Sequence, residues 1–519
     1  MGPFTGRSFT AHPNKTKRYS LNSLPSRPGA ARLGWIVPVV LLGGCAFLPD
    51  PLPPADLQIE QPTAASLAAA ENLSEQPVPQ AWWTLFNDDL LVQLERELDA
   101  GNLDLQLAAT RIEQSRARLG VAASAQGPQL DASAGYSRSR LSEYSRMAAL
   151  GASTAPGDYW SLGSGAHWEL DLWGQLSKRT DAARQRLQAS RYELAGARVS
   201  ISAELARTYL LLRGVQQQLQ LAERELGINR NLLTLQQSRR EQGVATDYDT
   251  ASARAAVSES QAQIPPLETQ RHQLMNALAL LLGRMPEALK TTLAEDARLP
   301  KRPKQLPVGV PSELAHRRPD ILAAEAQLRA ATADIAAARA DFYPRITLGL
   351  STGLEAMDSA DFGSWGSRTF ALGPSLYLPI FQGGRLRRML ELTEAREKAA
   401  AIAYRKTVLN AWHEVNNALH EYQEALGRYH RLDQARIDTE QALQAVQRAR
   451  QHGYASRIEV LQAQLALLHR EQAQTDAATA SALSVVALYR ALGGGWSDEL
   501  AAVPATDTGT EEAVPGGDA

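Results

Sequence analysis

The sequence contains little of what stabilises a compact globular domain. It has one cysteine in 519 residues, Cys45, so a disulfide within the chain is excluded. Aromatic residues make up only 6% of the chain, which suits thin contacts between helices better than a large globular interior. The formal net charge is −2, which gives no electrostatic reason to expect nucleic-acid binding.

Proline is absent from Arg385 to Leu492, and glycine occurs there only at positions 427 and 453. Ala, Leu, Gln, Glu and Arg dominate this stretch, and all of them favour helices. It predicts two long helices, at about 385–452 and 456–492, separated by a turn at Gly453. The first would span about 100 Å, far more than a globular core requires.

The chain contains the same pattern twice. Gly243 lies 210 positions before Gly453, and Pro128 lies 216 positions before Pro344. A constant offset indicates a duplicated unit of helix, strand, loop, strand, long helix, turn and long helix. The first copy predicts long helices at about 174–242 and 247–282. Leucines in the earlier of these recur every seven residues, as in a coiled-coil seam, at Leu205, Leu212, Leu219, Leu226 and Leu233.

The two copies differ at one place in the second long helix. Pro265 and Pro266 interrupt that helix in the first copy, where we expect a bend. The second copy has Thr475 and Asp476 at the corresponding positions.

The N-terminus has the layout of a bacterial lipoprotein precursor. A basic segment is followed by the apolar run 33–42 and then by Gly43-Gly44-Cys45, a pattern typical of a secretory signal peptide. The apolar run is too short to span a membrane. Leu42-Gly43-Gly44-Cys45 resembles a lipobox, in which Cys45 is acylated and becomes the mature N-terminus. The alternative is an ordinary buried cysteine.

Four runs alternate apolar and polar residues, which predicts β-strands. Each has about 11 residues, the length at which a tilted strand crosses a bilayer. A water-soluble sheet with one face on a core would show the same alternation, but the lipobox and the lack of other core material favour a membrane. The polar, lumen-facing candidates are His167, Glu169, Asp171 and Glu355. The runs are 130–140, 160–172, 346–356 and 368–380.

Four strands cannot close a barrel, and open edges in lipid leave backbone groups unpaired. The predicted barrel must therefore be shared between chains. Two chains would provide eight strands and a filled interior, whereas three would provide twelve strands and a lumen. Cyclic symmetry is the expected solution.

Several motifs, in this order, resemble the TolC-like outer-membrane factors, in the NodT-type lipoprotein branch that pairs with RND efflux pumps. The resemblance extends from Cys45 to about Gly495. It implies a mainly α fold with a membrane β-barrel: a homotrimer with a twelve-stranded outer-membrane barrel and a long α-helical coiled-coil tunnel in the periplasm. The motifs are Leu42-Gly43-Gly44-Cys45, Trp82-Trp83, Asn102-Leu103-Asp104, Arg318-Pro319-Asp320-Ile321, Phe342-Tyr343-Pro344 and Phe381-Gln382-Gly383-Gly384.

The resemblance also implies the function and the partners. The chain would be the passive exit duct of a tripartite pump, carrying small molecules from periplasm to exterior, with a periplasmic adaptor, an inner-membrane RND transporter and outer-membrane lipid as partners. It would be neither an enzyme nor a cofactor-binding protein. One alternative is the exit duct of a type I protein secretion system. Another is a lipid-anchored coiled-coil tether without a pore.

The family has a periplasmic aperture near the helical turns, narrowed by acidic residues six and nine positions after the turn glycine. After Gly453 these positions hold Glu459 and Gln462, and after Gly243 they hold Asp249 and Ser252. Only the first of each pair is acidic, which argues against a doubled acidic ring. Three copies of Glu459 around an axis would repel one another and attract cations.

Two further charges lie near the turns. Asp247 adds a carboxylate beside Asp249, and Arg457 could pair with a carboxylate of a neighbouring copy. The alternative for the acidic residues is a solvated helix start favoured by the helix dipole.

One sequence resembles a catalytic zinc site but lacks one of its ligands. His413-Glu414 begins a sequence like the HExxH zinc motif, but Asn417 replaces the second histidine, so no metal site is predicted. The predicted organisation is a signal peptide at 1–44, a lipidated proline-rich tether at 45–80, a first repeat at 81–283, a connector at 284–318, a second repeat at 319–495 and a disordered tail at 496–519.

Overall fold

The computed structural model describes residues 72–294, 298–309 and 317–497. The predicted signal peptide, Cys45 and most of the predicted tether and tail lie outside these ranges. Among the described helices, none is both long enough and apolar enough to cross a membrane.

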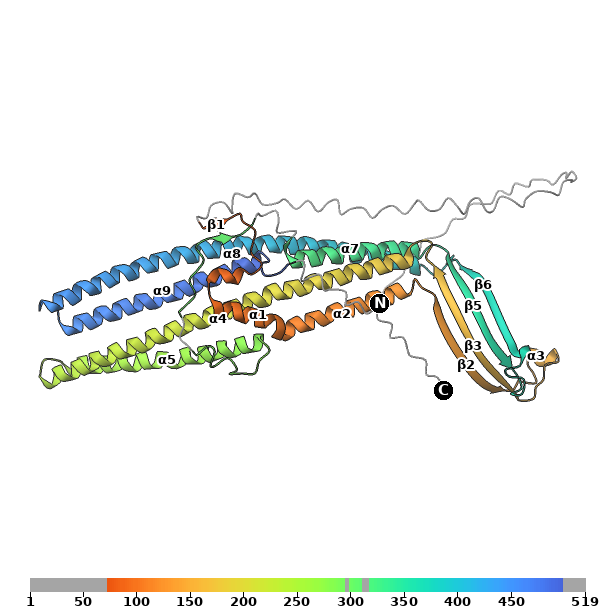
Figure 1. Cartoon of the computed structure of the whole chain (residues 1–519), viewed down its shortest axis with the longest axis horizontal. Coiled ribbons are helices and arrows are strands. Elements are labelled where there is room, and N and C mark those ends of the chain that lie inside the picture. Colours follow the sequence, from red (N-terminus) through yellow and green to blue (C-terminus); the bar gives the residue numbers. More distant parts are fainter. Residues whose placement is uncertain (1–71, 295–297, 310–316, 498–519) are drawn as a thin grey trace, which may run out of the picture. The chain divides into compact units, whose positions relative to one another are not determined.

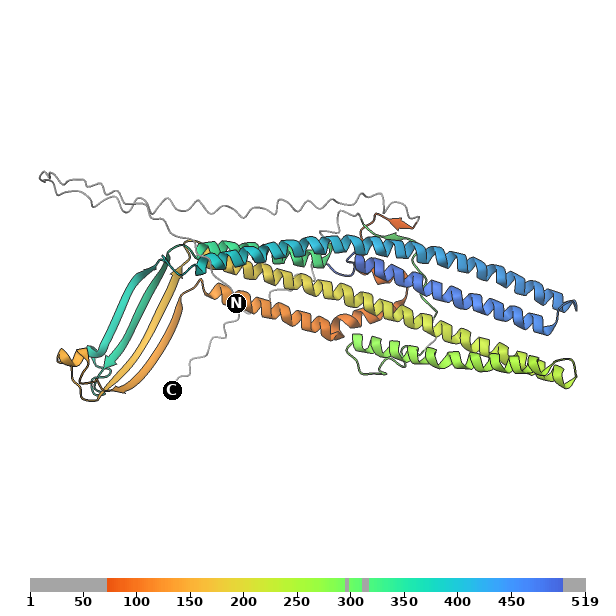
Figure 2. The same cartoon turned by 180° about the vertical axis from the view of Figure 1, so that it is seen from behind.

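The duplication predicted from the sequence is present as two matched pairs of long helices. Helix α4 covers Gln175–Glu241 and α8 covers Arg385–Gln451, and each has 67 residues. Helix α5 covers Asp247–Leu281 and α9 covers Arg457–Ala491, and each has 35 residues. Both pairs form antiparallel hairpins, with α4 against α5 and α8 against α9, and α4 also packs against α9 (Figures 1 and 2).

Shorter helices flank these hairpins. Helices α1 (Asp89–Gly101) and α2 (Leu103–Ser124) precede the first pair of strands, and α7 (Pro319–Ala340) precedes the second. Both α2 and α7 pack against α4, and α7 also contacts α8 (Figure 1). The 3₁₀ helix η2 (Trp82–Phe86) precedes α1.

The residues before α2 and α7 bind the ends of the long hairpins in the same way. The Asn102 side-chain amide donates to the Leu281 carbonyl at 2.7 Å, and its oxygen caps α2 by accepting from the Leu105 backbone amide. At the corresponding place in the second repeat, the Arg318 guanidinium donates to the Ala491 carbonyl at 2.8 Å. Different side chains thus satisfy equivalent carbonyls, which helix ends otherwise leave unpaired.

The four long strands form an antiparallel sheet in the order β2-β3-β5-β6. Strand β2 covers Gln129–Ser139, β3 Gly157–Leu170, β5 Arg345–Ala356 and β6 Arg368–Tyr377. The hairpin loops carry the short helices α3 (Arg146–Ala149) and η4 (Trp365–Ser367). The order leaves β2 and β6 as edge strands, as four strands that do not close on themselves require.

The main hydrophobic core lies where the short N-terminal helices pack against the long helices. Trp82 is fully buried and stacks on Tyr489, with ring centroids 5.5 Å apart. Residues of η2, α1, α4, α8 and α9 contribute to the same cluster. The connector joins it through β4 (Leu306–Pro307), which pairs in parallel with β1 (Leu73–Ser74).

The structure corrects two predicted boundaries. The tether was predicted to extend to residue 80, but Leu73 and Ser74 form a strand and Val78 is buried. The tail was predicted to begin at residue 496, but Trp496 is buried and its indole N–H donates to the Arg317 carbonyl at 3.1 Å. In both places apolar side chains pack on the folded unit although the surrounding sequence is rich in proline or small residues.

Helix α5 continues through Pro265 and Pro266, which confirms the single helix predicted at about 247–282, and the bend expected at these prolines stays a prediction. Each proline removes one backbone donor from the helix. Packing of α5 along α4 holds the helix together, and the Thr269 hydroxyl donates to the Pro265 carbonyl at 2.9 Å.

Candidate channel surface and gate

The turns between the long helices have the same backbone geometry. Gly243 and Gly453 have φ values of +74° and +78°, a region that glycine enters without strain. In each turn the glycine amide donates to the carbonyl three residues before it. The amide of the next residue, Val244 or Tyr454, donates to the carbonyl five residues before it, all at 2.9 Å. This is the Schellman arrangement, and it ends α4 and α8 sharply at the predicted glycines.

The predicted aperture acids Asp249 and Glu459 are both capping residues. Thr246 and Asp249 form a capping box at the start of α5, and Ser456 and Glu459 form one at the start of α9. The hydrogen bonds from Thr246 lower the pKa of Asp249, and those from the Ser456 backbone and hydroxyl lower the pKa of Glu459. Both carboxylates are therefore ionised at neutral pH and are fixed in place by the helix start.

The other predicted aperture residues lie on the same turns. Asp247 forms an ion pair with Arg240 across the turn at 2.5 Å. Arg457 and Gln462 are exposed near the start of α9. Within the described part of one chain, no hydrogen bond or ion pair joins the acids of the first turn to those of the second.

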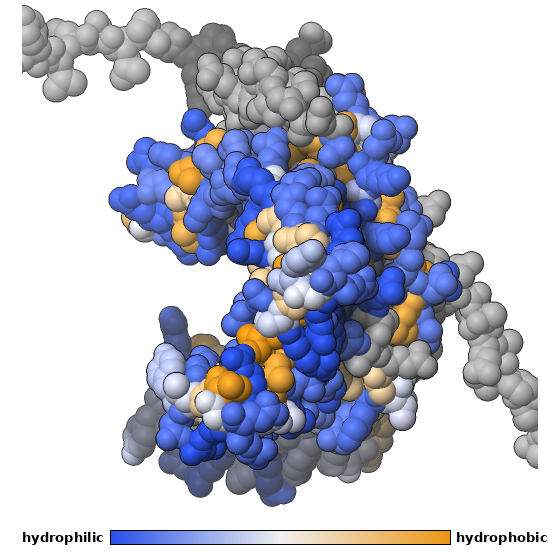
Figure 3. All heavy atoms as spheres, turned by 90° about the vertical axis from the view of Figure 1, so that its left-hand side faces the viewer, coloured by the Kyte–Doolittle hydropathy of each residue, from blue (hydrophilic) through white to orange (hydrophobic). Residues whose placement is uncertain are grey.

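Figure 3 looks onto the end of the molecule that carries these turns, and the surface there is mostly hydrophilic. Two tyrosines nevertheless stand out from the turns, because Tyr248 is 79% exposed and Tyr454 is 87% exposed. Exposed aromatic residues at the tip of a helical hairpin provide a surface on which another protein can dock.

A polar seam between α4 and α9 was not predicted from the sequence. Gln218 donates to Asp476 at 2.7 Å, and Arg224 pairs with Glu471 at 2.9 Å. We call these contacts, together with those of Glu225 below, the α4–α9 seam. They join α4 of the first repeat to α9 of the second repeat.

Glu225 is the most buried residue of the α4–α9 seam. It accepts from Gln472 at 3.0 Å, and His469 lies 3.7 Å from its carboxylate. The seam was missed because it joins different helices of the two repeats, and the internal offset aligns only equivalent helices.

The sheet has one apolar and one polar face, as the register shows. Leu130 lies opposite Ala166, Ala166 opposite Leu350, and Leu350 opposite Leu372, so these four residues share a face. Leu350 and Leu372 are 46% and 77% exposed. A sheet face this apolar and this exposed is suited to lipid.

The opposite face carries Asp131, Glu169 and Glu355, as well as His167, whose ring lies 3.9 Å from Asp131. Three of the four lumen-facing candidates are therefore on the polar face. The fourth, Asp171, was wrongly placed. It follows β3, and its carboxylate accepts from the Leu176 amide at 2.9 Å and the Ser177 amide at 2.7 Å.

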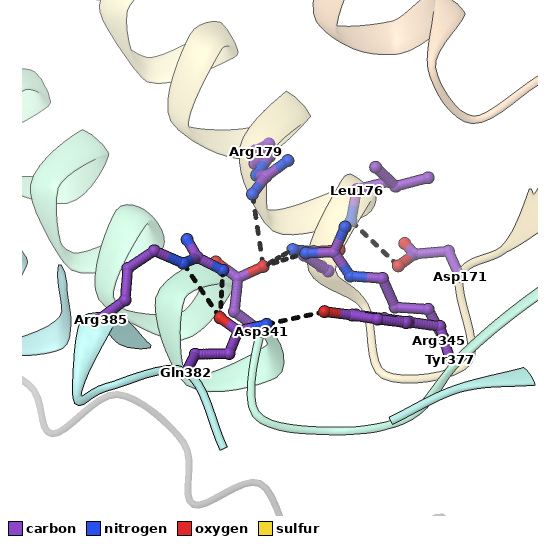
Figure 4. A network of polar contacts seen from close by, with 9 residues as sticks. Asp171, Leu176, Arg179, Asp341, Arg345, Tyr377, Gln382 and Arg385 are labelled. Carbon is purple, nitrogen blue, oxygen red and sulfur yellow. Dashed lines mark hydrogen bonds and ion pairs between the residues drawn. The ribbon is translucent and has the colours of Figure 1, made fainter. Parts of the chain in front are cut away.

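A polar network joins the sheet to the helices (Figure 4). Asp341, at the end of α7, accepts from Arg345 at 2.5 Å and from Arg179 at 3.5 Å, and Gln175 also donates to it. Gln382 accepts from Arg385 and donates to the Tyr377 hydroxyl at 2.7 Å. Strands β5 and β6 of the second repeat are thereby fixed to the first turns of α4 and α8.

The zinc-like sequence at His413 has a structural role instead. Glu414 pairs with Arg318 at 2.7 Å, and Arg318 also pairs with Asp320 at 2.7 Å. Glu414 thus helps to hold the start of α7 against α8.

A sheet with one lipid-compatible face, attached to long paired helices, defines a membrane channel with a helical extension. Comparison with known proteins identifies the type. The model of the outer membrane efflux protein family matches residues 94–284 and 310–494, and the chain belongs to this family. It is thus the outer-membrane channel of an efflux pump, and its function is transport and not catalysis.

The chain is similar to outer membrane protein OprJ of Pseudomonas aeruginosa, with 34% identity over 88% of this chain and 94% of that protein. It is also similar to the pyoverdine export outer membrane protein OpmQ of Pseudomonas putida, with 33% identity over 86% and 92% of the two chains. The solved structure of the outer-membrane channel OprN has a TM-score of 0.75 and 31% identity, over 82% of this chain and 95% of that one.

Proposed function

We propose that three copies of this chain form one closed channel. Each copy contributes a sheet of four strands with free edges at β2 and β6. Unpaired edges in lipid are unfavourable by several kcal/mol for each backbone group. Pairing β6 of one copy with β2 of the next removes every edge, and a barrel of twelve strands has room for a lumen. The apolar sheet face with two open edges is the observation that carries this proposal.

In this arrangement the long helices continue the lumen into the periplasm. The exposed turns with Tyr248 and Tyr454 then point away from the membrane, toward a periplasmic adaptor protein. An inner-membrane transporter of the RND type would supply the energy, and the channel would conduct passively. Cys45 would be acylated and would anchor each copy to the inner leaflet of the outer membrane after removal of residues 1–44.

The turns form the gate in this proposal. Three copies place Asp249 and Glu459 around the axis, with Asp247, Gln462 and Arg457 beside them. An ion pair between Arg457 of one copy and a carboxylate of the next would hold the ring closed. Opening would separate the α8–α9 hairpin from α4, and it would break the α4–α9 seam.

The double variant Asp249→Asn and Glu459→Gln tests the gate without destroying the helix starts. At both positions the new side chain keeps an oxygen that can accept from the N-cap residue, as in a capping box. The loss of charge is therefore separated from the loss of the cap. We expect severalfold higher single-channel conductance in planar bilayers, because the ion pairs between copies are lost. Glu421→Gln, an exposed glutamate on α8, is the matched control. Unchanged conductance in the double variant would refute the gate assignment.

The alternative of a type I protein exporter is not favoured, because the chain belongs to the outer membrane efflux protein family. Co-purification from membranes with an RND transporter and its adaptor, and not with an ATP-driven exporter, tests the proposed partners.

A further inference from the structure

The apolar face of the sheet ends in an aromatic group at its hairpin end. Tyr136 contacts Trp160, with ring centroids 4.4 Å apart, and Phe362 lies 6.3 Å from Trp160. From Trp160 to Leu170, both on the apolar face of β3, the strand rises about 33 Å, which a tilt of about 40° shortens to about 25 Å. This is the height of the lipid-facing band of an outer-membrane protein. The aromatic group therefore lies at the level of the headgroups, where such belts occur.

Two arginines lie on this face near the hairpin end, namely Arg138, which is opposite Asp158, and Arg368. Arg368 is the first residue of β6, opposite Leu354, and two residues before Phe370. Because side chains alternate along a strand, Arg368 shares the apolar face with Leu354, Phe370 and Leu372. Phe370 is 85% exposed, so the arginine continues a surface that contacts lipid.

The Arg368 side chain stacks on an aromatic ring and donates no hydrogen bond among the described residues. Its guanidinium carbon lies 3.7 Å from the ring centroid of Trp365, which is itself 81% exposed. A guanidinium stacked on an indole keeps its N–H groups free at the edge. Among the described residues, no carboxylate pairs with Arg368, whereas Arg138 pairs with Asp158 and Arg140 with Glu143.

A fixed guanidinium with free donors, at headgroup depth, is complementary to phosphate, which accepts two parallel N–H bonds from arginine. The hairpin end of the sheet is remote from the long helices (Figure 1), so in the proposed channel it faces the outer leaflet. We propose that Arg368, held by Trp365, binds a phosphate of a phosphorylated glycolipid in the outer leaflet. This inference depends on the proposed membrane orientation of the sheet.

The test measures lipid retained by the purified full-length channel. Wild type and the variants Arg368→Gln and Trp365→Leu are reconstituted into phosphatidylethanolamine nanodiscs doped with diphosphoryl lipid A, and bound lipid is counted by native mass spectrometry. We expect the apparent affinity to fall about tenfold in Arg368→Gln, since a charge-assisted hydrogen-bond pair is lost. A smaller loss is expected in Trp365→Leu. Arg140→Gln, which removes an arginine already paired with Glu143, should retain lipid as the wild type does.

Parallel samples identify the ligand. Dephosphorylated lipid A should bind the wild type no better than it binds Arg368→Gln, and neither phosphatidylglycerol nor free inorganic phosphate should replace lipid A. Equal retention by wild type and Arg368→Gln, or equal binding of the dephosphorylated lipid, would overturn the site. Displacement by phosphatidylglycerol would overturn the assignment to a glycolipid. The number of chains in each particle, read from the same mass spectra, separates this result from a failure of the channel proposal, because a wild type that stays a single copy would refute the channel itself.

Discussion

A buried carboxyl group between α1 and α4 makes the stability of this protein depend on pH. Glu95 is only 3% exposed, and burial raises the pKa of its carboxyl to about 8. The Ser202 hydroxyl donates to one of its oxygens at 2.9 Å, while the other oxygen has no hydrogen-bond partner among the residues that the structure describes. Nearby, Asp99 on α1 pairs with Arg198 on α4 at 2.7 Å, and the repulsion from Asp99 raises the Glu95 pKa further.

The direction of the effect follows from the two protonation states. The unfolded chain loses the Glu95 proton near pH 4.5, whereas the folded chain keeps it up to about pH 8. The free energy of unfolding therefore decreases as pH rises from about 4.5 through about 8. By pH 7 the loss is on the order of 3 kcal/mol relative to acid pH, at about 1.4 kcal/mol for each unit of pKa difference.

Glu95→Gln should remove this dependence. Glutamine has nearly the same shape, accepts the Ser202 hydrogen bond and carries no charge at any pH. We expect the variant to be more stable than wild type at pH 7 by roughly 3 kcal/mol and to match it near pH 4.5. Denaturant unfolding of the detergent-solubilised protein between pH 4.5 and 8.5 measures both curves. Glu113→Gln, the same substitution at an exposed site of α2, is the control. Parallel pH curves for wild type and Glu95→Gln would refute the reasoning.

Two further predictions concern the repeats and the polar face. Arg318→Ala should lower the free energy of unfolding by about 3 kcal/mol, because the contacts of this buried side chain to Glu414 and the Ala491 carbonyl are lost. Arg318→Asn should recover part of the loss, because Asn102 binds the equivalent carbonyl in the first repeat, and equal melting of both variants would contradict this. Glu169→Gln with Glu355→Gln removes two of the three carboxylates on the polar face of each copy, so the preference for cations in reversal-potential measurements under a salt gradient should decrease. An unchanged reversal potential would place these residues outside the lumen.

The sequence predicted the helix ends closely, because glycines and capping residues mark them directly. Gly243 and Gly453 stand where α4 and α8 end, and Thr246 and Ser456 begin the next helices. Because the two copies are related by a constant offset, the helix ends of one copy predict those of the other. Alternation predicted the strands and their two faces, whereas the pairing register came from the structure.

The errors and omissions have a common physical origin in packing that local sequence does not show. Trp496 lies in a sequence that looks like a tail, yet it is buried by contacts with Tyr192 and Val199. The α4–α9 seam, buried Glu95 and the stacking of Arg368 on Trp365 depend on which sides of distant elements face each other. The sequence located the two turns, and the structure adds that Asp249 and Glu459 cap the helices that follow them, whereas their role in a gate stays a prediction.

The number of chains in the conducting particle tests the account most directly. Native mass spectrometry of the detergent-solubilised protein, combined with conductance of the same preparation, should find three copies in every particle that conducts. A single copy that conducts ions, or a stable lone subunit without β-sheet in circular dichroism, would contradict the claim that each chain contributes only part of the channel wall.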